Sequence, residues 1–307
     1  MYIMNKSIRT LLGCLILVTT SLMAEFDLAV GMIFQNQAPQ LKEWIEFHKA
    51  QGVQHFYLYN NNSEDAFLKV LQPYMIEGLV TLIDWPYTYA NNDNGMWRQI
   101  QFGAYMDCIR KYEHETKWLA IIDSDEYLFC PTGKKIPELL ANYKDFGGLC
   151  VNWVRYGTSY KKEIPPGKWM VEVLTRCNTP DRRDRRFVKS IVQPRLVESC
   201  LNAHSFSYKE GKWAVNSAKE KVEGTIAARS VLNEIRLNHY WTGTETDFKK
   251  KKIPSRHKRR NEFDARRMNK MAKKCNAMED KAILPLLKKV PEYSNFKSIE
   301  CQDKKKT

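Results

Sequence analysis

Beyond residue 24 the sequence lacks long hydrophobic runs, because charged residues interrupt every later apolar stretch within about ten residues. No further membrane-spanning segment is therefore predicted. The eight cysteines include no CxxC pair, and their wide spacing argues against a zinc ribbon. There is no internal repeat and no low-complexity tract apart from short lysine runs. What is present is 43% hydrophobic and 12% aromatic residues in a chain of 307, which is enough for a substantial core and excludes global disorder.

The first 24 residues have the pattern of a targeting segment. Lys6 and Arg9 precede the apolar run "LLGCLILVTTSLMA", which ends in the small residue Ala24. This order is typical of a secretory signal, and the run is short for a spanning helix. We expect residues 1–24 to be a signal peptide or an N-terminal membrane anchor, and the protein to be exported or membrane-anchored. In an oxidising compartment one or two disulfides are plausible, with at least one thiol left over.

Acidic residues are scarce in one segment. Residues 247–275 hold thirteen Lys or Arg against three Asp or Glu, within a chain of net charge +14. This excess predicts contact with an anionic partner, such as an anionic membrane surface, or else a solvated helix face. Nucleic acid is an unlikely partner, because the segment offers only Phe248 and Phe263 for base stacking.

The first half of the chain alternates strand and helix patterns. Apolar strand patterns are separated by helical patterns with capping and stop residues, which predicts βαβ crossovers and a mainly parallel sheet. The predicted strands are 26–34, 53–60, 78–85 and 117–123, and the predicted helices are 39–52, 61–74 and 94–115. From about residue 146 the strand patterns are joined by irregular segments, where an acceptor or lid region would be built. In parallel sheets ligands bind beyond the carboxyl ends of the strands, and Asp123 is at such an end.

The stretch "WLAIIDSDEYLF" (118–129) is a buried strand pattern that ends in acids. Asp123 and Asp125 are two residues apart, so their side chains point roughly the same way if the backbone stays extended. Two like charges so close destabilise each other unless a cation or water separates them. Mg²⁺ or Mn²⁺ would resolve the conflict and could hold a diphosphate. The alternative is a solvated acidic turn.

Several blocks of the sequence resemble glycosyltransferase family 92, in that family's order. They are "KEWIEFHKAQGVQHFYLYNNNSED", "GMWRQIQFGAYMDCIRKY", "KWLAIIDSDEYLF", "VNWVRYGTSYKK", "RRFVKSIVQP" and "LNHYWTGTETDFKKK". The resemblance covers residues 26–252. It implies a GT-A-type (Rossmann-like) fold and the metal-dependent, inverting transfer of a sugar, galactose in the better-known members, from a nucleotide-diphosphate donor such as a UDP-sugar to a glycan or polysaccharide acceptor.

The resemblance also implies roles for individual residues. Asp123 and Asp125 correspond to the D-x-D carboxylates that meet the metal and the donor diphosphate. His239 matches a late histidine that completes the metal site in several such enzymes; the alternative is a hydrogen-bonded core histidine. Lys189 matches a basic position near the donor, or is a solvated strand lysine. Asn60 lies where nucleoside contacts are common, and a turn with a helix cap explains it equally well.

Inversion needs a carboxylate that takes the proton of the acceptor hydroxyl. The sequence does not single one out, and the candidates are Glu126, Glu163, Asp181 and Asp184. The predicted organisation is a targeting segment (1–24), a GT-A domain (25–245) and a basic helical C-terminal extension (246–307). The competing interpretations are a phosphatase of the haloacid dehalogenase type, a protein that binds nucleic acid or an anionic surface through 247–275, and a degenerate transferase fold that only binds.

Overall fold

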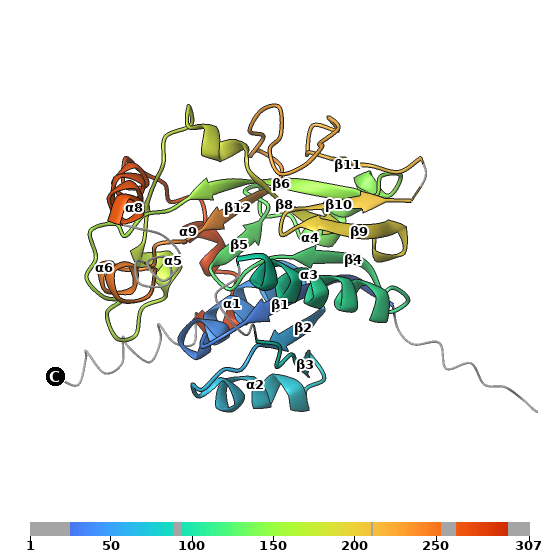
Figure 1. The fold of residues 1–307 in the computed structure, drawn as a ribbon, viewed down its shortest axis with the longest axis horizontal. Helices are drawn as coiled ribbons and strands as arrows, with labels where there is room; N and C mark the ends of the chain where they lie inside the picture. Colours follow the sequence, from blue (N-terminus) through green and yellow to red (C-terminus); the bar gives the residue numbers. More distant parts are fainter. Residues whose placement is uncertain (1–24, 89–93, 210, 253–261, 294–307) are drawn as a thin grey trace, which may run out of the picture.

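The computed structural model describes residues 25–88, 94–209, 211–252 and 262–293. The strands of its main sheet are β1 (Phe26–Phe34), β2 (His55–Asn60), β3 (Val80–Asp84), β4 (Thr116–Ile121), β5 (Glu126–Phe129), β6 (Gly148–Arg155), β8 (Val188–Val192), β11 (Ala214–Val215) and β12 (Arg236–His239). Their order is β3-β2-β1-β4-β8-β6-β12-β5, with β11 paired to β6 (Figure 1). The short strands outside it are β7 (Arg176–Cys177), β9 (Val197–Asn202), β10 (Ser205–Tyr208) and β13 (Met278–Glu279).

The helices flank this sheet. They are α1 (Ala38–Ala50), α2 (Phe67–Ile76), α3 (Asn94–Lys111), α4 (Ile136–Leu140), α5 (Met170–Val173), α6 (Glu245–Asp247), α8 (Glu262–Lys274) and α9 (Leu284–Leu287). Shorter helical turns are η1 (Ala141–Tyr143), η2 (Arg183–Arg186), η3 (Pro194–Leu196) and the π-helical η4 (Phe248–Lys252).

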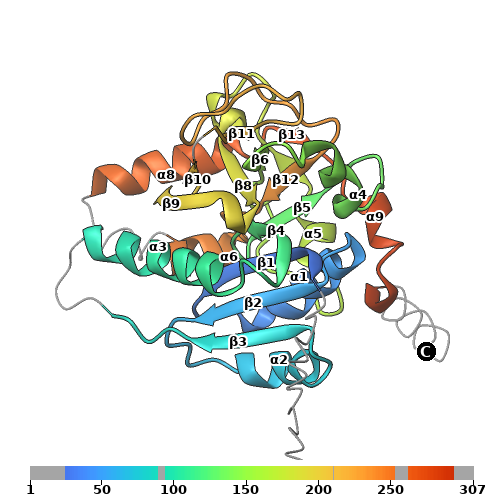
Figure 2. The same cartoon turned by 90° about the vertical axis from the view of Figure 1, so that its right-hand side faces the viewer.

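Most strand pairs of the main sheet are parallel. β1 pairs in parallel with β2 and β4, β2 with β3, and β6 with β11 and β12. β8 runs antiparallel to both β4 and β6, and β5 runs antiparallel to β12. The predicted α/β class with a mainly parallel sheet and flanking helices is confirmed (Figure 2).

β1 is buried on both faces, as expected of a parallel strand covered by helices. Leu28, Val30 and Met32 belong to one core cluster with the buried residues of α1 and α2, whereas Ala29 and Ile33 belong to another with those of α3. At Gly31, a Cβ atom would lie 3.0 Å from the Cys108 sulfur, so the glycine lets α3 pack closely on the sheet.

The described residues that follow β12 pack against the rest of the molecule. Met268 and Ala272 of α8 form a small apolar cluster with Trp241 and Phe248. β13 pairs with β7, and α9 adds Leu286 to the main core. The predicted boundary at residues 245 and 246 stays a prediction, and residues 253–261 lie outside the described residues.

The predicted location needs correction. We expected export or membrane anchoring through residues 1–24, but the described part of the chain contains no helix that is long and apolar enough to cross a membrane. Its longest helix, α3, has 18 residues and carries charged side chains such as Asp107 and Arg110. Residues 1–24 themselves lie outside the described residues. The six described cysteines are all free thiols, so no disulfide joins any two of them.

Candidate active site

The site is built where β4 ends and β5 begins. The chain turns at Ser124 and Asp125, and the turn is closed by a hydrogen bond from Glu126 N–H to Asp123 O (3.0 Å). Trp44 of α1 donates its indole N–H to Glu126 O (2.8 Å) and so ties the turn to the first helix. The backbone is therefore not extended through the three residues, and the two aspartates have different surroundings.

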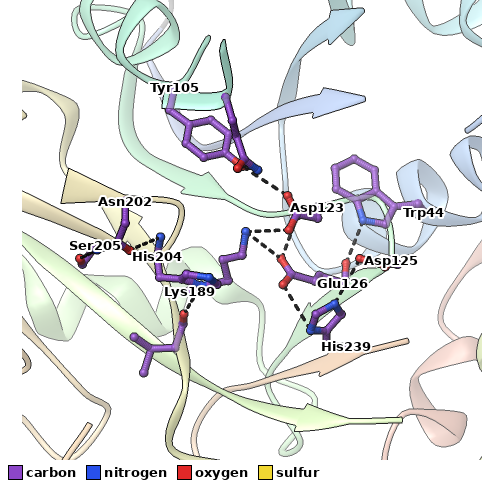
Figure 3. Close-up of polar contacts among 12 residues, drawn as sticks. Trp44, Tyr105, Asp123, Asp125, Glu126, Lys189, Asn202, His204, Ser205 and His239 are labelled. Carbon is purple, nitrogen blue, oxygen red and sulfur yellow. Dashed lines mark hydrogen bonds and ion pairs between the residues drawn. The ribbon is translucent and has the colours of Figure 1, made fainter. Parts of the chain in front are cut away.

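Asp123 is held from two sides (Figure 3). Its Oδ2 lies 2.9 Å from Lys189 Nζ, and its Oδ1 accepts a hydrogen bond from the Tyr105 hydroxyl (3.3 Å). Lys189, on β8, is 1% exposed, and its ammonium also lies 3.4 Å from Glu126 Oε2. The same Glu126 oxygen accepts the backbone N–H of Asp123 (2.8 Å). Asp123, Glu126 and Lys189 thus form a compact group, to which we refer as the buried cluster because Glu126 and Lys189 are buried; the Asp123 side chain is 34% exposed.

Burial and charge act in opposite directions on these carboxylates. Burial alone would raise the pKa of Asp123, but the adjacent Lys189 ammonium outweighs it, and the pKa lies below its usual range. Glu126 is 0% exposed; burial raises its pKa well above the usual range, and Lys189 offsets this only in part. The single Lys189 ammonium therefore stabilises the charged form of Asp123, whereas the Glu126 carboxyl group favours its neutral form.

Asp125 and His239 are partly exposed, unlike Lys189 and Glu126. β12 pairs with β5 so that His239 is directly opposite Glu126, and Tyr240 N–H donates to Asp125 O (2.8 Å). His239 Nε2 lies 3.5 Å from Asp125 Oδ1, with side-chain exposures of 13% and 23%. The other ring nitrogen, Nδ1, lies 3.8 Å from Glu126 Oε1, and the ring of Trp153 packs edge-on against the imidazole.

These groups meet a cavity of about 370 Å³ at the carboxyl ends of β1, β4 and β12. Its size falls at the lower end of the range for small-ligand sites. The described residues that line it are Ile33, Phe34, Gln35, Gln37, Gln40, Gln101, Asp123, Ser124, Asp125, Met170, His239, Tyr240, Thr242, Gly243 and Asp247. A ligand in this cavity would meet three aspartates, one histidine and four glutamine side chains.

The structure brings five of the predicted site residues together. Asp123, Asp125 and His239 line the cavity, whereas Lys189 lies beneath it, in contact with Asp123 and Glu126. Asn60 lies elsewhere: it is buried at the end of β2, and its side-chain oxygen accepts the backbone N–H of Ser63 (3.0 Å), as the turn interpretation expected. Its predicted donor contact stays a prediction.

The four candidate bases do not line the cavity in the described part of the chain. Glu126 is sealed in the buried cluster. Asp184 is buried elsewhere and accepts hydrogen bonds from Asn178 (2.8 Å) and Arg155 (3.3 Å). Glu163 and Asp181 are exposed to solvent. The geometry therefore favours none of them as the group that meets an acceptor.

The residues present can be compared with the needs of the predicted Mn²⁺ or Mg²⁺. Within the described ranges, His, Cys, Asp and Glu side chains nowhere gather in threes around a point that could hold a metal. Such ions are usually bound by one or two protein side chains, with substrate phosphates completing the shell. Asp125 and His239, 3.5 Å apart on the cavity wall, fit that requirement, whereas Asp123 is already engaged by Lys189 and Tyr105.

Sequence reasoning missed three groups of this site. Gln101, on the cavity wall, donates to the Tyr105 hydroxyl (2.8 Å), which in turn donates to Asp123. Asp247 lines the cavity from α6, and a sequence signal for it exists, because "TETD" has the spacing of a helix capping box. No comparable local pattern marks the glutamine and tyrosine, since their role depends on how α3 packs.

The fold is an α/β fold with a mainly parallel sheet, and its candidate site lies at the carboxyl ends of strands. The sequence model of glycosyltransferase family 92 matches residues 29–278, and the chain belongs to this family. A family 92 protein of Ricinus communis is 28% identical over 201 residues, covering 61% of this chain and 32% of the relative. A galactan beta-1,4-galactosyltransferase of Arabidopsis thaliana is 27% identical over 192 residues (59% of this chain, 36% of the relative). A beta-1,4-galactosyltransferase of Caenorhabditis elegans is 31% identical over 178 residues (56% of this chain, 40% of the relative).

The chain spans about a third of the length of the curated relatives it matches. Among solved structures, residues 1–349 of TarS from S. aureus align over 55% of this chain and 48% of that chain, with 13% sequence identity and a TM-score of 0.34, a likeness that carries no conclusion about this chain.

Proposed function

We propose that this protein is a glycosyltransferase that moves a hexose, with galactose as the first candidate, from a UDP-sugar to a glycan acceptor with inversion at the anomeric carbon. The observation that carries the proposal is the pairing of Asp125 with His239 on the wall of the cavity, directly above the buried cluster. Membership of glycosyltransferase family 92 supports the reaction class, and two of the relatives named above are galactosyltransferases.

In this proposal Asp125 and His239 hold a divalent cation together with the donor diphosphate. When bound, Mn²⁺ or Mg²⁺ would supply positive charge that stabilises the departing diphosphate. Asp123 lines the same wall, and its negative charge is kept in place by the buried ammonium beneath it.

Lys189 receives a different role from the one the sequence predicted. Its ammonium contacts two carboxylates and does not line the cavity in the described part of the chain. We assign it to positioning Asp123, not to direct contact with donor phosphate. A buried ammonium held 2.9 Å from the carboxylate fixes where that carboxylate points.

The anionic-surface alternative rests on residues 247–275, of which the structure describes part. On α8, Met268 and Ala272 face the domain, while Arg266, Arg267 and Lys270 are exposed. This arrangement is that of an ordinary amphipathic helix with a solvated basic face. Contact of this face with an anionic surface stays a prediction, separate from the transfer reaction.

A donor screen tests the proposal. The purified full-length chain is incubated with UDP-galactose, UDP-glucose and GDP-mannose, with Mn²⁺ or with a chelator, and released nucleoside diphosphate is measured with and without β-galactoside oligosaccharides. We expect release with a UDP-sugar that depends on the metal and increases with acceptor. If no donor is turned over and calorimetry detects no binding of Mn²⁺ with UDP, the proposal is wrong, and a binding-only fold is the better interpretation.

A further inference from the structure

Resting on the proposed function, the geometry points to Asp247 as the general base that accepts the proton of the acceptor hydroxyl. Three carboxylates occur among the described residues that line the cavity: Asp123, Asp125 and Asp247. The first two belong to the wall assigned to the donor. Asp247 comes from α6, the helix that follows β12, and is therefore the carboxylate left for the acceptor.

The side chain of Asp247 is oriented by its own helix start. The residue completes a capping box in which Asp247 N–H donates to Thr244 Oγ1 (3.2 Å), while Asp247 Oδ2 accepts from the Thr244 backbone N–H (3.2 Å) and hydroxyl (2.8 Å). The two bonds to Oδ2 hold the side chain in one rotamer, with Oδ2 directed at Thr244. A general base needs such fixed geometry before its pKa matters.

The backbone around Asp247 is anchored on both sides. The first N–H groups of α6 donate to the carbonyl oxygens of Lys161 (2.8 Å) and Lys162 (3.2 Å). The next residue, Phe248, is buried and packs edge-on against Trp241. Asp247 is thus presented to the cavity by a short segment that is tied to the domain before and after it.

Gly243 leaves the space that this arrangement needs. It has φ +60°, a left-handed conformation that side chains disfavour, and a Cβ at this position would lie 2.8 Å from Asp247 Cβ and 3.0 Å from its Oδ2. Gly243 also lines the cavity. Because residue 243 has no side chain, the Asp247 carboxylate has room to lie beside it.

The proposed step balances as follows. The acceptor oxygen attacks the anomeric carbon from the face opposite the diphosphate, and a new C–O bond forms. The bond from that carbon to the diphosphate oxygen breaks, and its electron pair leaves with UDP. The acceptor proton moves to the Asp247 carboxylate and is then lost to water. General-base catalysis of this kind contributes about 10²–10⁴-fold to a rate.

The test replaces Asp247→Asn, which keeps an oxygen that can accept from Thr244 and removes the base. The matched control is Glu245→Gln, which removes one carboxylate from the same helix at a position that the described cavity lining does not include. For D247N we expect a fall of about 10²–10⁴-fold in kcat for transfer to a sugar acceptor, with the donor KM within about threefold of wild type. The control should transfer at the wild-type rate.

Azide separates a catalytic base from a merely structural residue, because azide attacks without losing a proton. D247N should form the inverted glycosyl azide as fast as wild type. The assignment is wrong if D247N retains more than a tenth of the transfer rate, or if its azide reaction falls in proportion to its sugar transfer. A wild-type protein that transfers to no acceptor and no azide refutes the proposed function itself, so the two failures are distinguishable.

Discussion

The buried cluster and the cavity rim, which consists of Asp125, His239 and Asp247, meet at one cavity and differ in the burial of most of their charged groups. Asp123 belongs to the cluster, is 34% exposed and also lines the cavity. In the buried cluster, Lys189 and Glu126 are sealed from solvent, and one ammonium is shared by two carboxylates. At the rim, Asp125 and His239 are partly exposed and 3.5 Å apart. Residues that lie close to the Asp123–Asp125 turn can therefore have different roles. The difference indicates that the buried cluster fixes the positions of side chains, whereas a substrate would contact the rim.

The largest effect is expected from breaking the buried cluster. Lys189→Met leaves Asp123 and Glu126 without the ammonium that both contact, and the removal of one partner from a buried ion pair costs roughly 3–5 kcal/mol. Urea unfolding should show a loss of this size. The matched control is Lys117→Met, which breaks the exposed pair with Asp27 and should change the unfolding free energy little. Equal losses of unfolding free energy in the two variants would contradict the special contribution of the buried cluster to stability.

Asp125→Asn should have the opposite profile. The rim carboxylate is partly exposed, so its loss should leave the unfolding free energy within about 1 kcal/mol of wild type. Removal of one group that stabilises developing charge lowers kcat by about 10²–10³-fold. Steady-state kinetics with the active donor, paired with urea unfolding, measures both quantities. A stable variant with unchanged kcat contradicts a catalytic rim.

Gly243→Ala should displace the Asp247 side chain of the cavity rim. The added methyl group meets a left-handed φ of +60° and the Asp247 side chain at 2.8 Å, so we expect a loss of about 1–2 kcal/mol and a fall of about tenfold in kcat. Gly78→Ala is the control, because Gly78 has φ +71° with nothing within 4 Å of the added atom. It should show a similar loss of stability with no change in kcat.

Glu43 sharpens the comparison, because it is a buried carboxylate that forms no ion pair with a lysine in the described part of the chain. Its oxygens accept from the N–H groups of Met170 (2.7 Å) and Val171 (3.1 Å) and from the Tyr127 hydroxyl (3.0 Å). Burial raises its pKa to about 7, because these donors offset the loss of water only in part. The pKa of Asp123, which lies beside Lys189, is shifted in the opposite direction, below its usual range.

A raised carboxyl pKa means that the folded protein binds more protons than the unfolded chain between about pH 4.5 and 7. Stability from the neutral form of Glu43 is thus present at low pH and is lost as the pH rises through about 7. We expect a decrease of roughly 1 kcal/mol between pH 6 and 7 that is absent in Glu43→Gln. Urea midpoints of both proteins across this range measure the difference, and parallel curves would contradict it.

Local pattern predicted the first half of the fold well. Helical spacing placed α1 and α3, and the apolar runs placed β1 to β4, because each signal lies within one short segment. The helix predicted over 61–74 was misplaced: α2 begins at Phe67 and continues past Pro73 to Ile76. The location of Asp123 and Asp125 at a strand end followed from that order. The resemblance to family 92 then directed attention to His239, and the structure places this residue beside Asp125.

The rest depends on contacts between distant segments. Only the antiparallel pairing of β5 with β12 brings His239 to Glu126, and only the insertion of β8 beside β4 carries Lys189 into the core. No periodicity in the sequence predicts the register of either strand pair. The candidate bases failed to reach the cavity for the same reason: the sequence shows that a residue is acidic, but burial and direction are set by packing.

The pairing of β5 with β12 has a consequence for the order of events during synthesis. A ribosome releases Asp125 long before the strand that carries His239, and α6 emerges later still. The strand β8, which carries Lys189, also follows the Asp123–Asp125 turn in the chain. A nascent chain that stops before β12 therefore lacks His239, Gly243 and Asp247, and the wall of the cavity is completed only at the end of the main sheet's synthesis.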